Sequence, residues 1–152
     1  LILEDEGRLI GRCALPLPLQ AARHHADWIQ LEVPLEDRVQ HSYDNYILSN
    51  LEEMLTPSVD WDTAFNEFER GLLDALSRIQ KRLGDTRYRA LHAELTAALS
   101  SHRLGDPEPH KKWIEVLLTQ YYDPMYNYQM AKRVQAPIFR GNESEVIGYL
   151  TA

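Results

Sequence analysis

The chain has 152 residues, enough for one domain with a hydrophobic core, and its hydrophobic share of 44% and charged share of 26% are ordinary for a globular protein. Its formal net charge of −7 excludes a protein that coats nucleic acid with its whole surface. No apolar run reaches the length of a membrane span and the single Cys13 has no partner for an internal disulfide, so we expect a cytoplasmic protein with no membrane association.

The first residues are an apolar run, Leu1-Ile2-Leu3, followed by the acidic Glu4-Asp5-Glu6. They predict a short buried strand over residues 1–4, and because no turn precedes it we expect a fragment of a longer protein. P-loop NTPases place a Mg²⁺-holding acid at such a strand end, but the residues alone favour an ordinary strand end. No Gly-rich phosphate loop occurs in the sequence, so the phosphate cradle of any nucleotide site would precede Leu1.

Signals for strands and helices alternate up to about residue 50. Pro16 or Pro18 predicts the start of a short helix that reaches His25. Residues 28–33 are a second strand candidate, and residues 34–47 predict another helix. This alternation is typical of an α/β unit with parallel strands.

From residue 51 onward the pattern is helical. Apolar residues recur every three or four positions over 61–83, with Asp60 suited to cap the start and Gly84 to end the helix. A second stripe covers residues 88–102. The tight turn at Gly84 predicts that the two long helices pack antiparallel. Residues 136–141 are a late strand candidate, which we expect to return to the sheet that begins at residue 1.

A third helical stretch begins at His110 and is crowded with tyrosines around Asp123-Pro124. The residue before a proline is disfavoured in the α region, so we predict two helices, with Asp123 as the N-cap of the second and Pro124 as its first residue. Tyrosines offer an apolar face and a hydroxyl. The residues alone favour a helix–helix joint with half-buried tyrosines, and a ligand wall is the alternative.

Basic residues form two groups despite the negative net charge. The first group comprises Arg78, Lys81, Arg82, Arg87 and Arg89, and the second comprises Lys111, Lys112, Lys132, Arg133 and Arg140. For both groups the pattern favours solvated helix faces over phosphate contacts. Arg38 follows Glu36-Asp37, which in isolation favours a surface ion network over a phosphate contact. The histidines lack the spacing of a zinc site, and Cys13 has no patterned base, so we expect no metal ligands and no nucleophile.

Three stretches together resemble one family, the tRNA 2-selenouridine synthases, with order and spacing kept over nearly the whole chain. The first stretch contains Glu4-Asp5-Glu6, Arg8, Ile10-Gly11 and Leu15-Pro16, and the second runs from Leu31 to Val39. The third and most specific contains Trp113-Ile114-Glu115, Leu117-Leu118, Tyr121-Tyr122-Asp123-Pro124-Met125-Tyr126 and Phe139-Arg140-Gly141.

The resemblance implies a transferase with a rhodanese-like domain, which holds a catalytic cysteine, followed by a P-loop domain. Such enzymes replace sulfur by selenium in wobble 2-thiouridine of tRNA through a geranylated intermediate, with selenophosphate and geranyl diphosphate as co-substrates. The chain would be the helix-rich C-terminal half of the P-loop NTPase-like α/β domain. Its parts would be a partial P-loop-like α/β segment (1–50), a helical subdomain (51–135), and a return strand with the C-terminal tail (136–152). Because the phosphate loop and the rhodanese cysteine are missing, and Cys13 does not match the latter, we expect these residues alone to be inactive.

The resemblance also implies roles for individual residues. Glu4 and Asp5 would lie beside the diphosphate or its Mg²⁺, and Arg8 and Arg38 would contact phosphate oxygens. The tyrosines expected to line an isoprenoid pocket, or to stack on a base of the tRNA anticodon loop, are Tyr121, Tyr122 and Tyr126. The first basic group would contact tRNA backbone phosphates. An enzyme that supplies selenophosphate is an implied partner, and the oligomeric state stays open.

Two other functions fit the same residues. The runner-up enzyme is a P-loop small-molecule kinase, for which the acidic strand end would serve equally well. From another class, a non-catalytic helical RNA-binding module would bind tRNA in a strongly salt-dependent way without a nucleotide.

Overall fold

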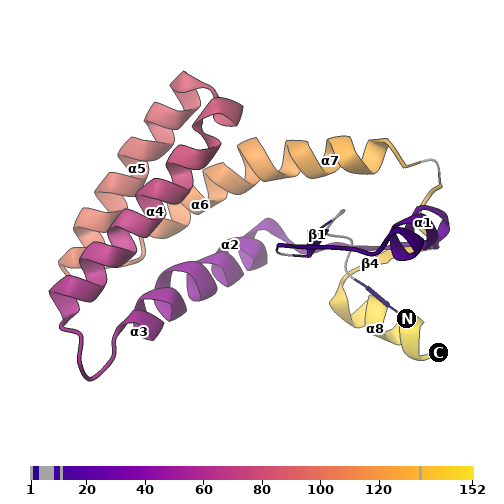
Figure 1. Cartoon of the computed structure of the whole chain (residues 1–152), viewed down its shortest axis with the longest axis horizontal. Coiled ribbons are helices and arrows are strands. Elements are labelled where there is room, and N and C mark those ends of the chain that lie inside the picture. Colours follow the sequence, from indigo (N-terminus) through magenta and orange to yellow (C-terminus); the bar gives the residue numbers. More distant parts are fainter. Residues whose placement is uncertain (1, 4–8, 11, 134) are drawn as a thin grey trace. The chain divides into compact units, whose positions relative to one another are not determined.

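The computed structural model describes residues 2–3, 9–10, 12–133 and 135–152 (Figure 1). The chain forms two compact units: unit 1 comprises Leu1–Glu32 and Val134–Ala152, and unit 2 comprises Val33–Arg133. The predicted boundary at residue 50 falls inside a continuous helical run of unit 2. That run packs against later helices of the same unit, so residues 33–50 group with the helical part.

Unit 1 contains the described strands and two helices. Its elements are β1 (Leu9–Ile10), β2 (Cys13–Ala14), α1 (Leu17–His25), β3 (Ile29–Leu31), β4 (Phe139–Gly141) and α8 (Glu143–Thr151). The predicted helix that ends at His25 and both later strand candidates are confirmed. The predicted strand over residues 1–4 is wrong for Ile2 and Leu3, which are exposed and outside any strand, while Leu1 and Glu4 lie outside the described residues.

The late strand pairs with the strand predicted at residues 28–33, while Leu1, where the expected sheet would begin, lies outside the described residues. β4 runs parallel to β3, with Phe139 opposite Ile29 and Gly141 opposite Leu31. Gly141 is buried, and a Cβ at this position would lie 2.6 Å from Glu145 Oε2. Glu145 is held there because it forms a capping box with Asn142 at the start of α8. The Phe139-Arg140-Gly141 motif therefore joins a sheet strand directly to a helix start.

Unit 2 is entirely helical. Its elements are α2 (Leu35–Tyr43), the π-helical η1 (Asp44–Ser49), α3 (Asn50–Met54), α4 (Trp61–Leu83), α5 (Asp85–Arg103), α6 (His110–Leu117), the π-helical η2 (Leu118–Tyr122) and α7 (Asp123–Ala131). The helix predicted over 34–47 is confirmed and extends further as η1 and α3. Among the described residues, no helix combines the length and the apolar character that crossing a membrane requires.

The long pair α4 and α5 forms the predicted hairpin (Figure 1). Asp60 caps α4 by accepting a hydrogen bond from the Thr63 amide at 3.0 Å. Gly84 joins the helices at φ 78°, a left-handed conformation that glycine adopts without strain. The apolar stripes of both helices face each other in the core, and the residues buried deepest include Phe65, Phe68 and Leu95.

The predicted break at Asp123-Pro124 is absent. Asp123 has φ −59° and ψ −46°, so it is helical and the N-cap prediction is wrong. The chain runs from α6 into α7 through the π-helical η2, in which the Asp123 amide donates to the carbonyl of Leu118, five residues back. The inserted π turn accommodates Pro124 in the first turn of α7, where a missing N–H costs little.

Candidate functional site

The structure brings together the three tyrosines singled out by sequence, which we call the tyrosine corner: Tyr121, Tyr122 and Tyr126. The rings of Tyr121 and Tyr122 meet edge to face at 5.0 Å, and those of Tyr122 and Tyr126 stack at 6.3 Å. Tyr126 is 52% exposed. Burial raises the pKa of Tyr122, and the hydroxyls of Tyr121, Tyr126 and Tyr46 raise it further. Tyr122 therefore stays neutral near pH 7 and keeps a hydroxyl donor.

Arg38 of α2 forms a bidentate ion pair with Asp123, which adjoins the tyrosine corner. Its Nη1 and Nη2 donate to the two carboxylate oxygens at 2.5 and 3.1 Å, and both side chains are partly buried. The hydrogen bond to Asp123 raises the pKa of the guanidinium above its ordinary value. Arg38 Nε is buried and has no hydrogen-bond acceptor among the described residues. The predicted phosphate ligand is therefore engaged by an internal carboxylate.

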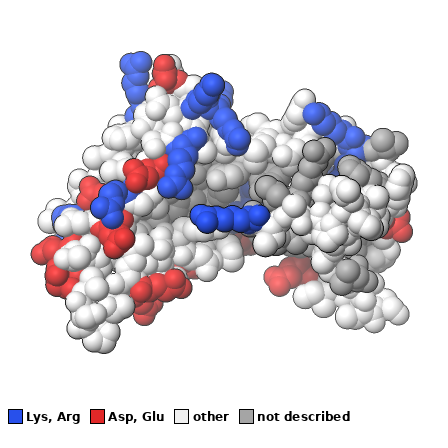
Figure 2. All heavy atoms as spheres, in the orientation of Figure 1, with Lys and Arg blue, Asp and Glu red and all other residues white. Residues whose placement is uncertain are grey.

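The first basic group lies at the joined end of α4 and α5, which we call the hairpin tip: Arg78, Lys81, Arg82, Arg87 and Arg89. All five side chains are exposed, and Figure 2 shows basic side chains gathered over this end of the hairpin. Within the described part of the chain, four of them make no hydrogen bond and no ion pair. The fifth, Arg82, donates from Nη1 to the Tyr121 hydroxyl at 3.5 Å. The tip and the tyrosine corner are thus neighbours.

Members of the second basic group are mostly engaged. Lys111 pairs with Glu108 at 2.8 Å and lies over the ring of Tyr43, while Lys112 pairs with Glu94 at 2.7 Å. In unit 1, Arg140 pairs with Glu32 across the β3–β4 sheet at 3.4 Å. The Lys132 ammonium lies 4.1 Å from the centre of the Tyr128 ring. These cations contact local partners, whereas the exposed cations of the hairpin tip can bind an external anion.

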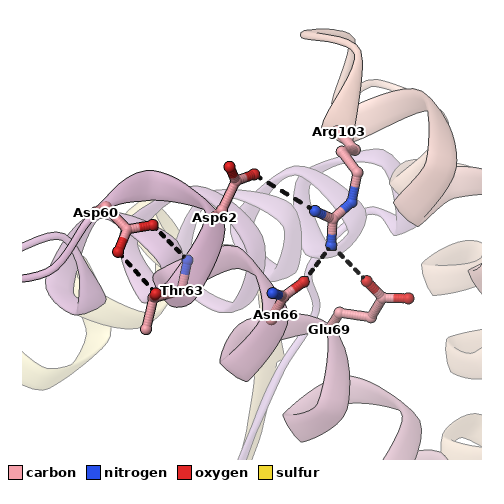
Figure 3. A network of polar contacts seen from close by, with 6 residues as sticks. All are labelled: Asp60, Asp62, Thr63, Asn66, Glu69 and Arg103. Atoms are coloured by element: carbon pink, nitrogen blue, oxygen red, sulfur yellow. Dashed lines mark hydrogen bonds and ion pairs between the residues drawn. The ribbon is translucent and has the colours of Figure 1, made fainter.

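The opposite end of the hairpin, which we call the hairpin base, is centred on Arg103. Its guanidinium donates to Asn66 at 2.7 Å and Glu69 at 2.9 Å, and approaches Asp62 at 3.7 Å (Figure 3). It also lies 4.5 Å from the centre of the Phe65 ring. These contacts tie the end of α5 to the start of α4.

Sequence reasoning missed a buried chain of polar rings formed by His102, His110 and Trp113. The Trp113 indole N–H donates to His110 Nδ1 at 2.9 Å, so the proton of neutral His110 resides on Nε2, 3.3 Å from His102 Nδ1. Burial, reinforced by His102, lowers the pKa of His110 to about 4. Burial also lowers the pKa of His102. The signal available was the helical spacing of three between His110 and Trp113.

Glu4, Asp5 and Arg8 lie outside the described residues. Within the described ranges, no cluster of three or more His, Cys, Asp or Glu side chains is arranged to hold a metal ion. Cys13 is exposed in β2.

These features define a class: a helix-rich α/β protein with a small parallel sheet and a helical hairpin whose exposed cations adjoin a group of three tyrosines. Comparison with known proteins makes the assignment specific. The family model described as the tRNA 2-selenouridine synthase AAA domain matches residues 1–152. The chain belongs to the tRNA 2-selenouridine synthase family.

Curated relatives of the chain are named tRNA 2-selenouridine synthase. The chain is 47% identical over 149 residues to a tRNA 2-selenouridine synthase of Hahella chejuensis, covering 98% of this chain and 39% of the relative. Identity is 41% over 150 residues to the protein of Pseudomonas fluorescens, covering 98% and 41%, and 37% over 153 residues to that of Alcanivorax borkumensis, covering 100% and 42%. The chain thus spans about two fifths of the length of these curated relatives. No solved structure matches.

Proposed function

We propose that the chain is part of a cytoplasmic tRNA 2-selenouridine synthase, and that unit 2 binds the anticodon stem-loop of its tRNA. In this proposal the hairpin tip contacts backbone phosphates and the tyrosine corner receives the wobble nucleoside or its geranyl group. The relatives' names support tRNA modification as the activity of the whole protein.

One observation carries the proposal: Arg82 of the hairpin tip donates a hydrogen bond to the partly buried Tyr121, which links the exposed cations to the tyrosine corner. Phosphate contacts position RNA, whereas unstacked bases of loops are recognised by stacking on aromatic rings. The tip supplies the first kind of contact and the half-exposed Tyr126 supplies a ring face for the second. A chain with net charge −7 binds RNA through such a local patch and not through its whole surface.

The chemical steps belong to the whole protein. Selenium would come from selenophosphate delivered by its supplying enzyme, and geranyl diphosphate would alkylate the thiouridine sulfur before selenium replaces it. Glu4, Asp5 and Arg8 would hold the diphosphate, with Mg²⁺ where one is required. Residues 1–152 alone would bind tRNA without completing the reaction.

The test of the function is mass spectrometry of tRNA nucleosides from cells that lack the full-length gene and grow with selenite. Loss of 2-selenouridine, restored by the intact gene, is the expected outcome. Unchanged 2-selenouridine in the absence of a second gene copy would contradict the proposal and favour the kinase.

The test of the site compares two sets of charge removals in the full-length protein. Replacing Arg78, Lys81, Arg87 and Arg89 by Gln should weaken tRNA binding by roughly 100-fold and reduce the salt slope of log K by about 3. The matched control replaces Lys111, Lys112 and Arg140 by Gln, cations that already have partners, and should change the salt slope little. Equal effects of the two sets would refute a specific role for the tip. Tip-dependent tRNA binding in a protein that makes no 2-selenouridine would favour the non-catalytic RNA module.

A further inference from the structure

We propose that Asp123 is a positioning residue: through Arg38 it fixes the helix that carries the tyrosine corner in the orientation needed for reaction. The inference assigns Arg38 to this internal clamp and removes it from the phosphate ligands. The activity measurement that tests this inference rests on the proposed function.

The geometry of the clamp is specific. Arg38 and Asp123 are 85 residues apart in sequence, and their two parallel hydrogen bonds join α2 to the first turn of α7. A bidentate arginine–carboxylate pair fixes direction as well as distance. Asp123 immediately follows Tyr122, and Tyr126 lies one helical turn further on. Holding the Asp123 carboxylate therefore sets the rotation of both stacked rings about the helix axis.

The π-helical η2 explains why a clamp is needed there. A π turn is rare and often occurs at functional sites; Pro124, which has no N–H to donate, is compatible with it, and the Arg38 ion pair fixes the residue at its end. η2 ends at Tyr122, directly before Asp123. Removing the ion pair frees the end of η2 to change its rotation about the helix axis, which moves Tyr122 and Tyr126 from their present positions.

The donors of Arg38 argue against a direct phosphate contact. The fork formed by Nη1 and Nη2 is occupied, because each donates one N–H to Asp123, and Nε is buried. A bidentate phosphate contact would have to displace Asp123, leaving a partly buried carboxylate without its cation, which is costly. The exposed cations of the hairpin tip, which have no carboxylate partner among the described residues, offer phosphate contacts without that cost.

The experiment uses the full-length protein and a charge exchange. We expect Asp123→Asn and Arg38→Met each to lower kcat for 2-selenouridine formation by roughly 10- to 100-fold, because misplacement of reacting groups by about 1 Å has effects of that size. KM for tRNA should stay nearly unchanged, because the tip is intact. The exchanged double variant, Arg38→Asp with Asp123→Arg, should recover most of the lost kcat. The matched control is Glu32→Gln, which breaks the exposed Arg140 ion pair and should leave kcat unchanged.

Three results would overturn the proposal. An exchanged variant as inactive as Arg38→Met, beside an active Asp123→Asn, would make Arg38 a substrate ligand. Single variants with a lower melting temperature but full kcat would make the pair merely structural. The third result is a tyrosine titration curve in Asp123→Asn that equals that of the wild type, which would show that the ion pair does not set the surroundings of Tyr122. The Tyr122 signal is identified as the one lost in Tyr122→Phe. The tyrosine titration does not depend on enzyme activity, so it tests the Arg38–Asp123 pair by itself. Failure of the proposed function would instead be indicated by a wild-type protein that forms no 2-selenouridine.

Discussion

The two ends of the α4–α5 hairpin use the same residue type in opposite ways. At the base, Arg103 is surrounded by Asp62, Asn66 and Glu69 and lies over Phe65. At the tip, Arg78 and Arg87 are exposed without an ion pair or hydrogen bond in the described part of the chain. An arginine whose donors are satisfied internally stabilises the fold, whereas an exposed and unpaired one adds little to stability and raises the local positive potential.

The difference predicts a separation of effects. Changes at the base should lower the free energy of unfolding and affect tRNA binding only through the folded fraction. Changes at the tip should weaken tRNA binding at unchanged stability. The following variants, ordered from the largest expected effect to the smallest, test that separation.

Phe65→Ala should cause the largest loss at the base. Phe65 is fully buried, stacks on Trp61 at 4.8 Å and supports the Arg103 guanidinium. Removing a buried aromatic ring costs about 3 to 5 kcal/mol of unfolding free energy. Urea denaturation of the variant measures this loss, with Leu104→Ala, at a 90% exposed position, as a control that should change little. A loss as small as that of the control would mean that the base does not hold the hairpin together.

Acidification should weaken the same end of the hairpin through His110. Its pKa is about 4 in the folded protein and about 6.5 when unfolded, so the unfolded state binds more protons between these values. The contribution of neutral His110 to the unfolding free energy is therefore fully present above pH 6.5, and the unfolding free energy falls by about 3 kcal/mol as the pH drops to 4. Protonation also puts an N–H on Nδ1, where the Trp113 indole already donates.

The check is unfolding free energy measured between pH 4.5 and 7, with a non-ionising variant measured in parallel to account for the carboxylates that titrate at the acidic end of this range. His110→Gln keeps one acceptor and one donor but does not ionise, so its stability should vary much less with pH. Equal pH dependence in both proteins would refute the assignment to His110.

Arg103→Gln should have a moderate effect. It removes the contacts of the partly exposed guanidinium with Asp62 and Glu69 and its interaction with the buried Phe65 ring, for an expected loss of about 1 to 2 kcal/mol. Thermal unfolding measures the change. tRNA affinity of the folded variant should equal that of the wild type, and a changed salt slope would place Arg103 in the RNA interface.

Arg78→Gln should leave stability within about 0.5 kcal/mol of the wild type, as is usual for exposed positions. Loss of one phosphate contact should reduce the salt slope of log K for tRNA by about 1 and weaken affinity a few-fold. Binding titrations at several salt concentrations provide the measurement. A drop in melting temperature like that of Arg103→Gln would erase the distinction between tip and base.

Much of the fold follows from local sequence. The stripe from residue 61 to 83, the Asp60 cap and the Gly84 turn predict α4 and its antiparallel partner, because periodicity, capping and positive φ are properties of a few neighbouring residues. The strands at 29–31 and 139–141 were also predicted. Their mutual pairing was not, since strand register depends on residues more than 100 positions apart.

The candidate site divides in the same way. The positions of the tyrosines and of the basic group were evident from sequence, and the three tyrosines do lie together. Which cations have partners was not evident: Lys112 pairs with Glu94, on another helix, while Arg78 has no ion pair among the described residues. Charge along a chain does not reveal which opposite charge approaches it in space.

The conformation of Asp123 could not be predicted from its sequence neighbours. A residue before proline, with a side chain suited to capping, predicted a helix start, and that preference is worth about 1 kcal/mol. The structure instead places Asp123 inside a helix, held by two charge-assisted hydrogen bonds from Arg38. By itself the sequence determined the hairpin, the two later strands and the family, but neither α8 nor the continuous run from α6 to α7. The tertiary structure alone decided the helical conformation of Asp123, because a partly buried bidentate ion pair outweighs a local backbone preference.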